Sequence, residues 1–243
     1  MIINHSIRPY IILNGVNSNS IKGLLISELP PISKPAIRVQ QEEIDGRDGD
    51  IVTPLGYAAY DKVITIGLTY EYVIDDIIEF FNSSGKVVFS NEPEKYYFYS
   101  IYNQIDFERL IRFKKAEVTL HVQPFKFSDT ENEITYNISG SNELAIRNNG
   151  NIYSRPTITI TGSGDINLFI NGSQLLTIDL EATSQTIIID SEAMNAYNSD
   201  KTTLLNRLVR GDYDNIRLKV GNNLISFTGN VSKVVIDNYS RWI

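Results

Sequence analysis

Apolar and polar residues alternate along most of this 243-residue sequence, and this pattern constrains the fold more than any other feature. A period of two places successive side chains on opposite faces of a β-strand. The pattern is clearest in residues 116–124, AEVTLHVQP. Strands are predicted in the first half of the chain at Tyr10–Leu13, Leu24–Leu29, Ile37–Gln41, Val63–Tyr70, Lys86–Ser90, Lys95–Tyr102 and Ala116–Pro124. We therefore expect a mainly β protein.

Residues 73–85, VIDDIIEFFNSSG, break this alternation. Asp75 and Asp76 would fall in the first turn of a helix, where the helix dipole favours negative charge, and Gly85 is a suitable C-terminal stop. The large apolar side chains recur at helical spacing, at Ile74, Ile77, Ile78 and Phe81. We predict one amphipathic α-helix packed on a sheet.

The polar segment SDTENEITYN, residues 128–137, is the best candidate for a domain boundary. It separates a first domain, residues 1–130, from a second, residues 131–243, and each is long enough to bury its own core. Short strands with regular turn signals in the second domain are typical of a β-sandwich. Its predicted turns and loops include hairpin turns at Asn171-Gly172 and Gly221-Asn222 and a loop at 162–165, GSGD.

The composition excludes several kinds of site. The chain has no cysteine, so it forms neither disulfides nor thiolate metal sites. Its net charge of −7 comes without a basic cluster that could neutralise phosphates, which argues against gripping DNA or an anionic membrane. No stretch approaches the ~18 apolar residues of a membrane span, and the first residues lack a signal-peptide pattern. We expect a soluble protein made in a reducing cytoplasm.

One stretch, EEIDGRDGD at residues 42–50, concentrates five acids, one arginine and two glycines. A calcium loop of the EF-hand type needs ligands at its third and twelfth positions. Counted from Asp45, those positions hold Arg47 and Gly56, so the pattern fails. A catalytic carboxylate pair needs one desolvated acid, which a glycine-rich turn does not provide. We predict a charged turn that acts through contact.

Histidine is scarce, which limits acid–base chemistry. His121 shares a strand face with polar residues, and His5 lies near the N-terminus. Neither is near a nucleophile motif such as GxSxG, and GSGDIN at 162–167 is neither a P-loop nor a dinucleotide fingerprint. We predict no catalytic residue, no cofactor and no metal.

The aromatic run KYYFYSIY, residues 95–102, is a further feature that needs an explanation. In a strand, Tyr97 and Tyr99 take one face and Tyr96 and Phe98 the other. A strand that is aromatic on both faces is either buried in the core or has one face at a protein interface. Both possibilities remain open from the sequence.

Four stretches together resemble the distal tail proteins of siphophages that infect Gram-positive bacteria. They are EEIDGRDGDIVTPLGY, GKVVFSNEPEKYY, YNQIDFERLIRFKKAEVTLHVQPFKF and the C-terminal NNGNIYSRPTITITGSGDINLFING with LKVGNNLISFTGNV and the final RWI. The resemblance covers most of the chain. It implies a non-enzymatic virion protein, assembled in the host cytoplasm, that forms a homo-hexameric ring at the tail tip or baseplate and serves host adsorption. The implied partners are the major tail tube protein, a tail-associated lysin or tail-tip protein, and a receptor-binding protein, with DNA passing through the ring without specific binding and no membrane contact.

The resemblance also implies different roles for the two domains. Residues 1–130 would be the ring-forming belt domain, a β-sandwich with one α-helix and an extended loop or hairpin. Residues 131–243 would be a galectin-like β-sandwich, similar to carbohydrate-binding modules, that serves as a docking platform. The galectin residue combination of His-x-Asn-x-Arg with Trp-x-x-Glu is absent, because this half has no histidine and its only tryptophan is Trp242. Direct recognition of a host cell-wall saccharide by this domain is the alternative function.

A ring gives the charged turn a role. The segment Asp45–Tyr60 is long for a strand connection, and long ordered loops usually carry contacts. We predict that its residues Ile51, Leu55 and Tyr57 lie on the adjacent subunit, with Arg47 paired to an acid across the interface; the competing hypothesis places its acids along the DNA channel. The predicted interface residues are Asp45, Arg47, Asp48, Asp50, Ile51, Leu55, Tyr57 and Tyr60. A further set either forms intersubunit ion pairs or is a solvated strand end: Asp106, Glu108, Arg109 and Arg112.

Overall fold

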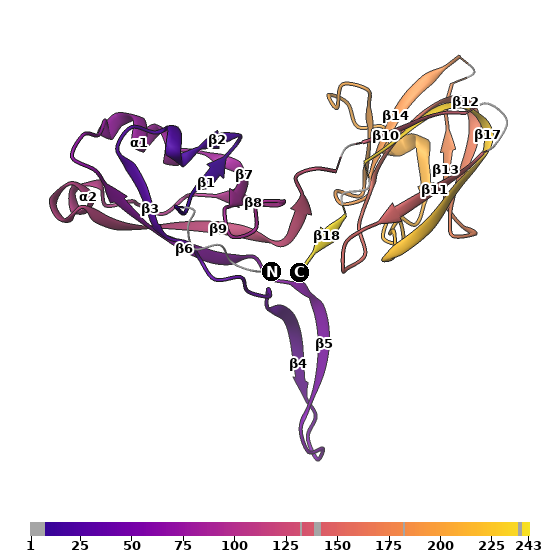
Figure 1. The fold of residues 1–243 in the computed structure, drawn as a ribbon. Helices are drawn as coiled ribbons and strands as arrows, with labels where there is room; N and C mark the ends of the chain where they lie inside the picture. Colours follow the sequence, from indigo (N-terminus) through magenta and orange to yellow (C-terminus); the bar gives the residue numbers. More distant parts are fainter. Residues whose placement is uncertain (1–7, 132, 139–141, 182, 238–239) are drawn as a thin grey trace. The chain divides into compact units, whose positions relative to one another are not determined.

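The fold is seen in a computed structural model of the chain (Figure 1), which describes residues 8–131, 133–138, 142–181, 183–237 and 240–243. The chain divides into two compact units, Met1–Asp129 together with Ile243, and Thr130–Trp242. Both are built mainly from antiparallel β-strands, which confirms the mainly β prediction. Within the described ranges, no helix combines the length and the apolar character needed to cross a membrane.

An antiparallel sheet dominates the first unit, with its strands in the order β2-β1-β7-β8-β9-β6-β3. One face of the central strands is buried, as in β9, where Val118 and Leu120 are fully buried and Thr119 between them is not. The predicted strands are present, with ends that differ by a few residues. The bounds are Ile11–Leu13 (β1), Val16–Asn17 (β2), Leu24–Glu28 (β3), Tyr60–Leu68 (β6), Ser84–Phe89 (β7), Lys95–Ser100 (β8) and Lys115–Ser128 (β9).

The aromatic run forms β8 and uses both faces of the sheet. Tyr97 and Tyr99 are buried in the core of the unit. On the opposite face, Tyr96 stacks on Phe127 with 5.5 Å between ring centroids, and Phe98 remains partly exposed. The core position is therefore confirmed for Tyr97 and Tyr99. On the other face Tyr96 is buried and Phe98 is exposed, and contact of that face with a partner stays a prediction.

Helix α1 (Ile74–Phe81) lies where it was predicted, with the two predicted aspartates in its first turn. The face that it buries is different in one position: Phe80 is buried, and Ile78 is exposed. The reason is that Phe80 continues the stripe set by Ile77, three residues earlier. The prediction for Gly85 is wrong, because this glycine lies within β7 at φ 139°.

A second helix, α2 (Phe107–Phe113), corrects the prediction of a single helix. The Asp106 carboxylate accepts a hydrogen bond from the Arg109 backbone N at 2.8 Å and so caps the N-terminus. Leu110 is fully buried and anchors the helix to the core. Lys114 follows in the left-handed region at φ 57°, which ends the helix. The charged set predicted to be either ion-pairing or a strand end therefore belongs to a helix and its cap.

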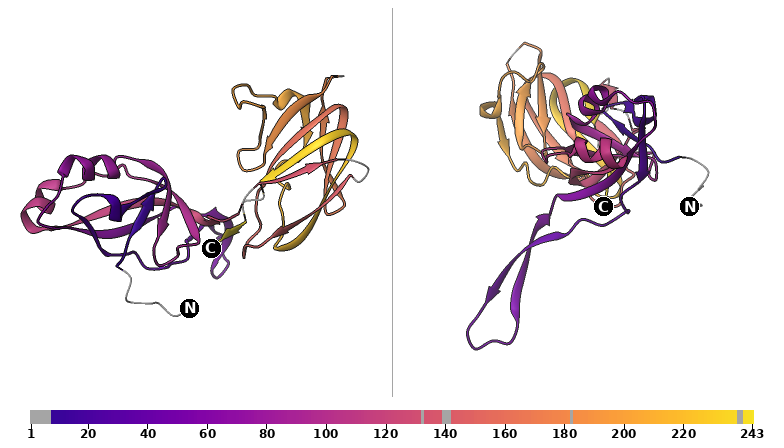
Figure 2. Two further views of the ribbon diagram at one scale, coloured as in Figure 1. Left: turned by 45° about the horizontal axis from the view of Figure 1, so that its top comes forward. Right: turned by 90° about the vertical axis from the view of Figure 1, so that its left-hand side faces the viewer.

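Strands β4 (Ile37–Glu43) and β5 (Asp50–Tyr57) form a separate two-stranded hairpin in the first unit. It extends away from the large sheet, as Figure 1 and the right-hand view of Figure 2 show. Of the two forms predicted for this region, an extended loop or a hairpin, the hairpin is confirmed. Most of the predicted long loop Asp45–Tyr60 is therefore strand.

The second unit is built around two long strands, β12 (Thr157–Ile170) and β17 (Gly221–Asp237), which pair along two stretches. Before the break in register β12 also pairs with β14, and after it with β13, so the long strands contribute to two groups of strands around one apolar core. The other bounds are Ile134–Asn137 (β10), Glu143–Asn148 (β11), Ser173–Asp179 (β13), Gln185–Asp190 (β14), Asn195–Asn198 (β15), Val209–Gly211 (β16) and Arg241–Trp242 (β18).

The turn predictions for this unit had mixed outcomes. Asn171 and Gly172, at φ 52° and 85°, connect β12 to β13, which confirms the hairpin turn. Gly221-Asn222 is instead the start of β17, paired with the end of β11. The predicted loop at 162–165 lies inside β12 at its break in register, where a Cβ on Gly162 would come within 2.4 Å of the Asn230 carbonyl oxygen.

Candidate subunit interface

The hairpin has a defined register, which places its side chains on two faces. Pairing runs from Ile37 opposite Tyr57 to Glu43 opposite Asp50. A break in register leaves Leu55 as an extra residue on β5, a β-bulge. The turn that joins the strands, residues 44–49, includes two glycines with positive φ, 82° and 76°, which no other residue type adopts as easily.

One face of the hairpin is apolar and exposed. Ile37, Val39 and Val52 share this face, because Val39 follows Ile37 by two positions and Val52 pairs with Gln41, two positions further. These three side chains are 45%, 43% and 50% exposed, and Leu55 at the bulge is 55% exposed. Every residue of β4 is exposed. A two-stranded hairpin with an uncovered apolar face is marginal alone, and such surfaces mark contact sites.

The base of the hairpin is held by a buried lysine of β6. Lys62 is 3% exposed, and its Nζ donates a hydrogen bond at 2.9 Å to the carbonyl oxygen of Pro31, just before β4. Three aromatic rings surround this Nζ at 5.0 to 5.7 Å from their centroids: Tyr60, Phe89 and Tyr97. Burial lowers the pKa of the Lys62 ammonium, and the charge of Glu92 partly offsets that effect.

Glu92 connects this lysine to the rest of the sheet. Its Oε1 accepts a hydrogen bond from Lys126 Nζ at 2.9 Å, and its Oε2 accepts one from the Tyr97 hydroxyl at 3.1 Å. The pKa of Tyr97 is raised strongly, first by burial and then by the charge of Glu92. Asn91, beside it, donates to the carbonyl oxygen of Pro30 at 3.1 Å. The network therefore fixes the segment from which the hairpin starts. No sequence motif predicts this network.

The predicted interface residues separate into two groups in the structure. Tyr57 packs edge-on against Phe125 at 5.3 Å, and the Tyr60 hydroxyl donates to the Ser33 carbonyl oxygen at 3.4 Å, so both lie at the base of the hairpin. Ile51 is half-buried on the face opposite Val52. The remaining predicted residues are exposed: Asp45, Arg47, Asp48 and Asp50 in or beside the turn, and Leu55 at the bulge near the base.

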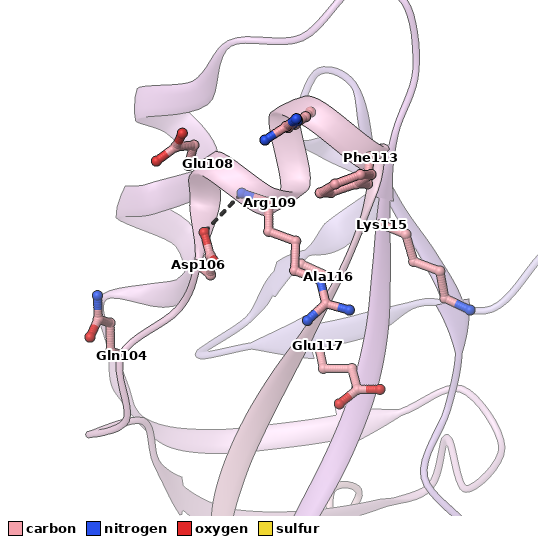
Figure 3. Close-up of a pocket in the computed structure, with 9 residues that line it drawn as sticks. Gln104, Asp106, Glu108, Arg109, Phe113, Lys115, Ala116 and Glu117 are labelled. Carbon is pink, nitrogen blue, oxygen red and sulfur yellow. Dashed lines mark hydrogen bonds between the residues drawn. The ribbon is translucent and has the colours of Figure 1, made fainter.

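A groove of about 1020 Å³ lies beside α2 and the start of β9 (Figure 3). The Arg109 side chain extends across it toward the start of β9, and Phe113 stands at its edge, 64% exposed. The groove is lined by Gln104, Asp106, Glu108, Arg109, Arg112, Phe113, Lys115, Ala116 and Glu117. It is thus a mixed-charge surface with one large apolar side chain.

A row of polar residues crosses the sheet at His121. Asp61 and Ser100 are its partners on the two neighbouring strands, and the Asp61 carboxylate lies 2.8 Å from His121 Nδ1. No hydrogen bond joins Ser100 to His121 in the described chain, and the row lies outside the α2 groove, so it lacks the geometry of an activated nucleophile. No group of three or more acidic or histidine side chains is arranged to hold a metal among the described residues. His5 lies outside those residues.

The second unit carries a hydrogen-bonded row of neutral polar side chains. Asn167 donates to Thr228 Oγ1 at 3.0 Å and accepts from Thr177 Oγ1 at 2.9 Å and from Gln174 Nε2 at 3.0 Å. Arg210, on the neighbouring strand β16, lies opposite Thr177 in the register of the sheet and is exposed. The row therefore spans β17, β12, β13 and β16 on the outer face of the unit.

Comparisons with known proteins agree with this fold. Residues 17–122 match the family described as phage tail protein RIFT-related domain. No curated protein matches the chain by sequence. Among solved structures, the chain is similar to the Dit protein of phage SPP1, described as a hub adsorption apparatus in phages infecting Gram-positive bacteria, with a TM-score of 0.65, 15% identity, and coverage of 94% of this chain and 98% of that one.

A second solved structure with this fold is the baseplate of phage P2 in its activated conformation with calcium. The TM-score is 0.53 at 12% identity, with coverage of 95% of this chain and 97% of that chain. At such identities the likeness establishes the fold. Together with the family match, it confirms the predicted resemblance to phage distal tail proteins.

Proposed function

We propose, from the phage tail protein domain at residues 17–122 and the distal tail protein fold of the whole chain, that this chain is a structural component of a siphophage tail tip. Six copies form a ring through their first units, and the ring joins the tail tube to the tail-tip and receptor-binding proteins. The observation that carries the ring is the hairpin. Its exposed apolar face has no cover within the described part of its own unit, and a neighbouring copy would supply one.

A ring is the natural product of such a contact. The hairpin and the surface that receives it are different parts of the chain, so the contact is heterologous, and copies related by rotation close into a ring. The buried Lys62–Glu92 network would fix the direction of the hairpin, which sets the rotation between neighbours. Interactions that hold a short segment in one direction favour closure over open chains of subunits.

The purified protein is expected to assemble into particles with six times the mass of the 27.5 kDa chain. Mass photometry measures this mass, and negative-stain images should show rings with six-fold symmetry. A protein that stays monomeric up to micromolar concentrations, or rings of a different number, would contradict the hexamer.

A second candidate function, recognition of a cell-wall saccharide by the second unit, is favoured by the row at Asn167. Its amides and hydroxyls are already oriented by hydrogen bonds, and Arg210 stands at its end with no ion pair among the described residues. Such groups can hydrogen-bond sugar hydroxyls without reorganisation. Phe169, half-buried on the same face of β12, adds a ring.

Changing Asn167 or Arg210 to alanine should then reduce saccharide binding by at least about tenfold. Asn167→Ala leaves the oriented side chains of Thr228, Thr177 and Gln174 without their partner, and Arg210→Ala removes a donor to the sugar hydroxyls. A glycan array probed with the full-length protein measures this. Thr159→Ala is the matched control, since Thr159 lies on the same strand before its break in register. If the wild-type protein binds no saccharide on the array, this second function is excluded for the sugars tested and the docking role remains.

A further inference from the structure

Two groups of charged side chains in the first unit lack ion-pair partners within the part of the chain that is described. One is the hairpin turn and its flanks, residues 42–50, with five acids and Arg47. The other is in the α2 groove, where neither Arg109 nor Arg112 forms an ion pair with a carboxylate; Arg112 lies only against the Phe113 ring, at 5.3 Å. Unpaired charges of opposite sign on one protein are available to pair between copies.

The two surfaces also match in their apolar parts. Ile44 begins the turn and is 45% exposed, although acids flank it on both sides. Phe113 is the large apolar side chain of the groove, and arginine precedes it. An apolar contact surrounded by charged pairs is the usual composition of a protein interface.

We propose that the turn at residues 44–49 of one copy, with the adjoining Asp50, occupies the α2 groove of a neighbouring copy. This rests on the proposed ring and names the surface that receives the hairpin. The acids of the turn pair with Arg109 and Arg112, and Ile44 packs on Phe113. Arg47, the one base of the turn, pairs with Glu117 from the start of β9. The groove volume of about 1020 Å³ is at the upper limit of ordinary ligand pockets, which suits a peptide turn.

Both surfaces carry charges of either sign. This favours contact between the turn and the groove over the alternative that the acids of the turn line a DNA channel. A wall that only repels phosphate needs acids alone, and Arg47 in the middle of the turn would weaken it. In the groove the same arginine has a use, because Glu117 and Glu108 offer carboxylates. The groove combines Arg109, Arg112 and Lys115 with three acids, Asp106, Glu108 and Glu117, so it offers partners both to the acids of the turn and to its one base.

Cross-linking between two singly substituted proteins tests the contact, because the natural chain has no cysteine. Asp48→Cys and Arg112→Cys proteins are mixed and treated with a short bismaleimide. We expect a covalent dimer in the mixture at several times the amount found with either protein alone. Asp76→Cys, on the exposed side of α1, replaces Asp48→Cys in the control and should give no such dimer.

The particle mass separates this proposal from the ring itself. A six-fold particle without the turn-to-groove cross-link overturns the docking proposal and leaves the ring intact. The cross-link without a six-fold particle supports docking and overturns the hexamer. Absence of both overturns both proposals.

Exchange of charges gives a second, independent test. Arg47→Glu and Glu117→Arg should each raise the concentration needed for assembly by about tenfold, and the double variant should recover most of that loss. Glu79→Lys and Arg207→Glu change exposed residues outside both surfaces, so they should leave the concentration needed for assembly unchanged. Additive losses in the double variant would show that the two side chains do not meet.

Discussion

Val39→Asp should abolish assembly of the ring, whereas Gln40→Asp, one residue further along the same strand, should leave it intact. The two positions have the same backbone environment in β4 and are both exposed in the single chain. They differ in the face that they occupy: Val39 lies beside Pro54 on the apolar face, and Gln40 lies opposite Thr53 on the other. The pair therefore tests which face is covered by a neighbour.

The expected size of the effect follows from burial. Covering a valine side chain contributes about 1.5 to 3 kcal/mol, and burying a carboxylate without a partner costs several kcal/mol more. A ring of six repeats the contact at every subunit boundary, so the loss accumulates over the particle. Val39→Asp should thus shift the protein to monomers at concentrations where the natural sequence is fully assembled, a change of at least about a hundredfold.

Mass photometry over a dilution series measures this shift. The melting temperature of the monomer should change little, because Val39 is 43% exposed and belongs to neither apolar core. Equal loss of assembly in both variants would show that the hairpin acts through its charge or its fold rather than through its apolar face. Intact rings in Val39→Asp would remove the hairpin from the interface.

The features that could be predicted from the sequence are those with a local cause. Alternation marks β9 because the buried and exposed sides of that strand differ at every step, and Asn171-Gly172 marks a turn because both residues tolerate positive φ. Helix α2 was missed because it is only seven residues long and Leu110 is its one fully buried residue, so it has hardly any apolar period. The cap at Asp106 was its main signal.

The hairpin shows a second reason why parts of the structure could not be predicted from the sequence. Its first strand alternates regularly, but Pro54 and Leu55 break the pattern of the second at the bulge, so loop and hairpin could not be separated. The network at its base depends on Lys62, Glu92 and Lys126, which are far apart in the sequence and meet only in the folded sheet. No local pattern predicts that a lysine will be buried among aromatic rings.

Glu92→Ala should lower the free energy of unfolding of the first unit by about 3 to 5 kcal/mol, the usual result of removing one partner from a buried ion pair. The Glu92 and Lys126 side chains are only 12% and 9% exposed. Without the carboxylate, Lys126 and Lys62 are two buried cations that repel each other and have no counter-charge among their described neighbours. The Tyr97 hydroxyl loses its acceptor as well.

Hydrogen exchange measured on peptides from β8 and β9 reports this loss separately from the second unit. Glu94→Ala is the matched control, because Glu94 is exposed two residues away, and its effect should stay below about 0.5 kcal/mol. Glu92→Gln should fall between the two, since an amide keeps an acceptor but not the charge. Faster exchange should extend to the segment around Pro31, which Lys62 holds at the base of the hairpin, and ring assembly should weaken with it. If Glu92→Ala unfolds the unit no more easily than Glu94→Ala, the network does not hold the hairpin, and its direction is set by other contacts at its base, such as the packing of Tyr57 on Phe125 and the Tyr60–Ser33 hydrogen bond.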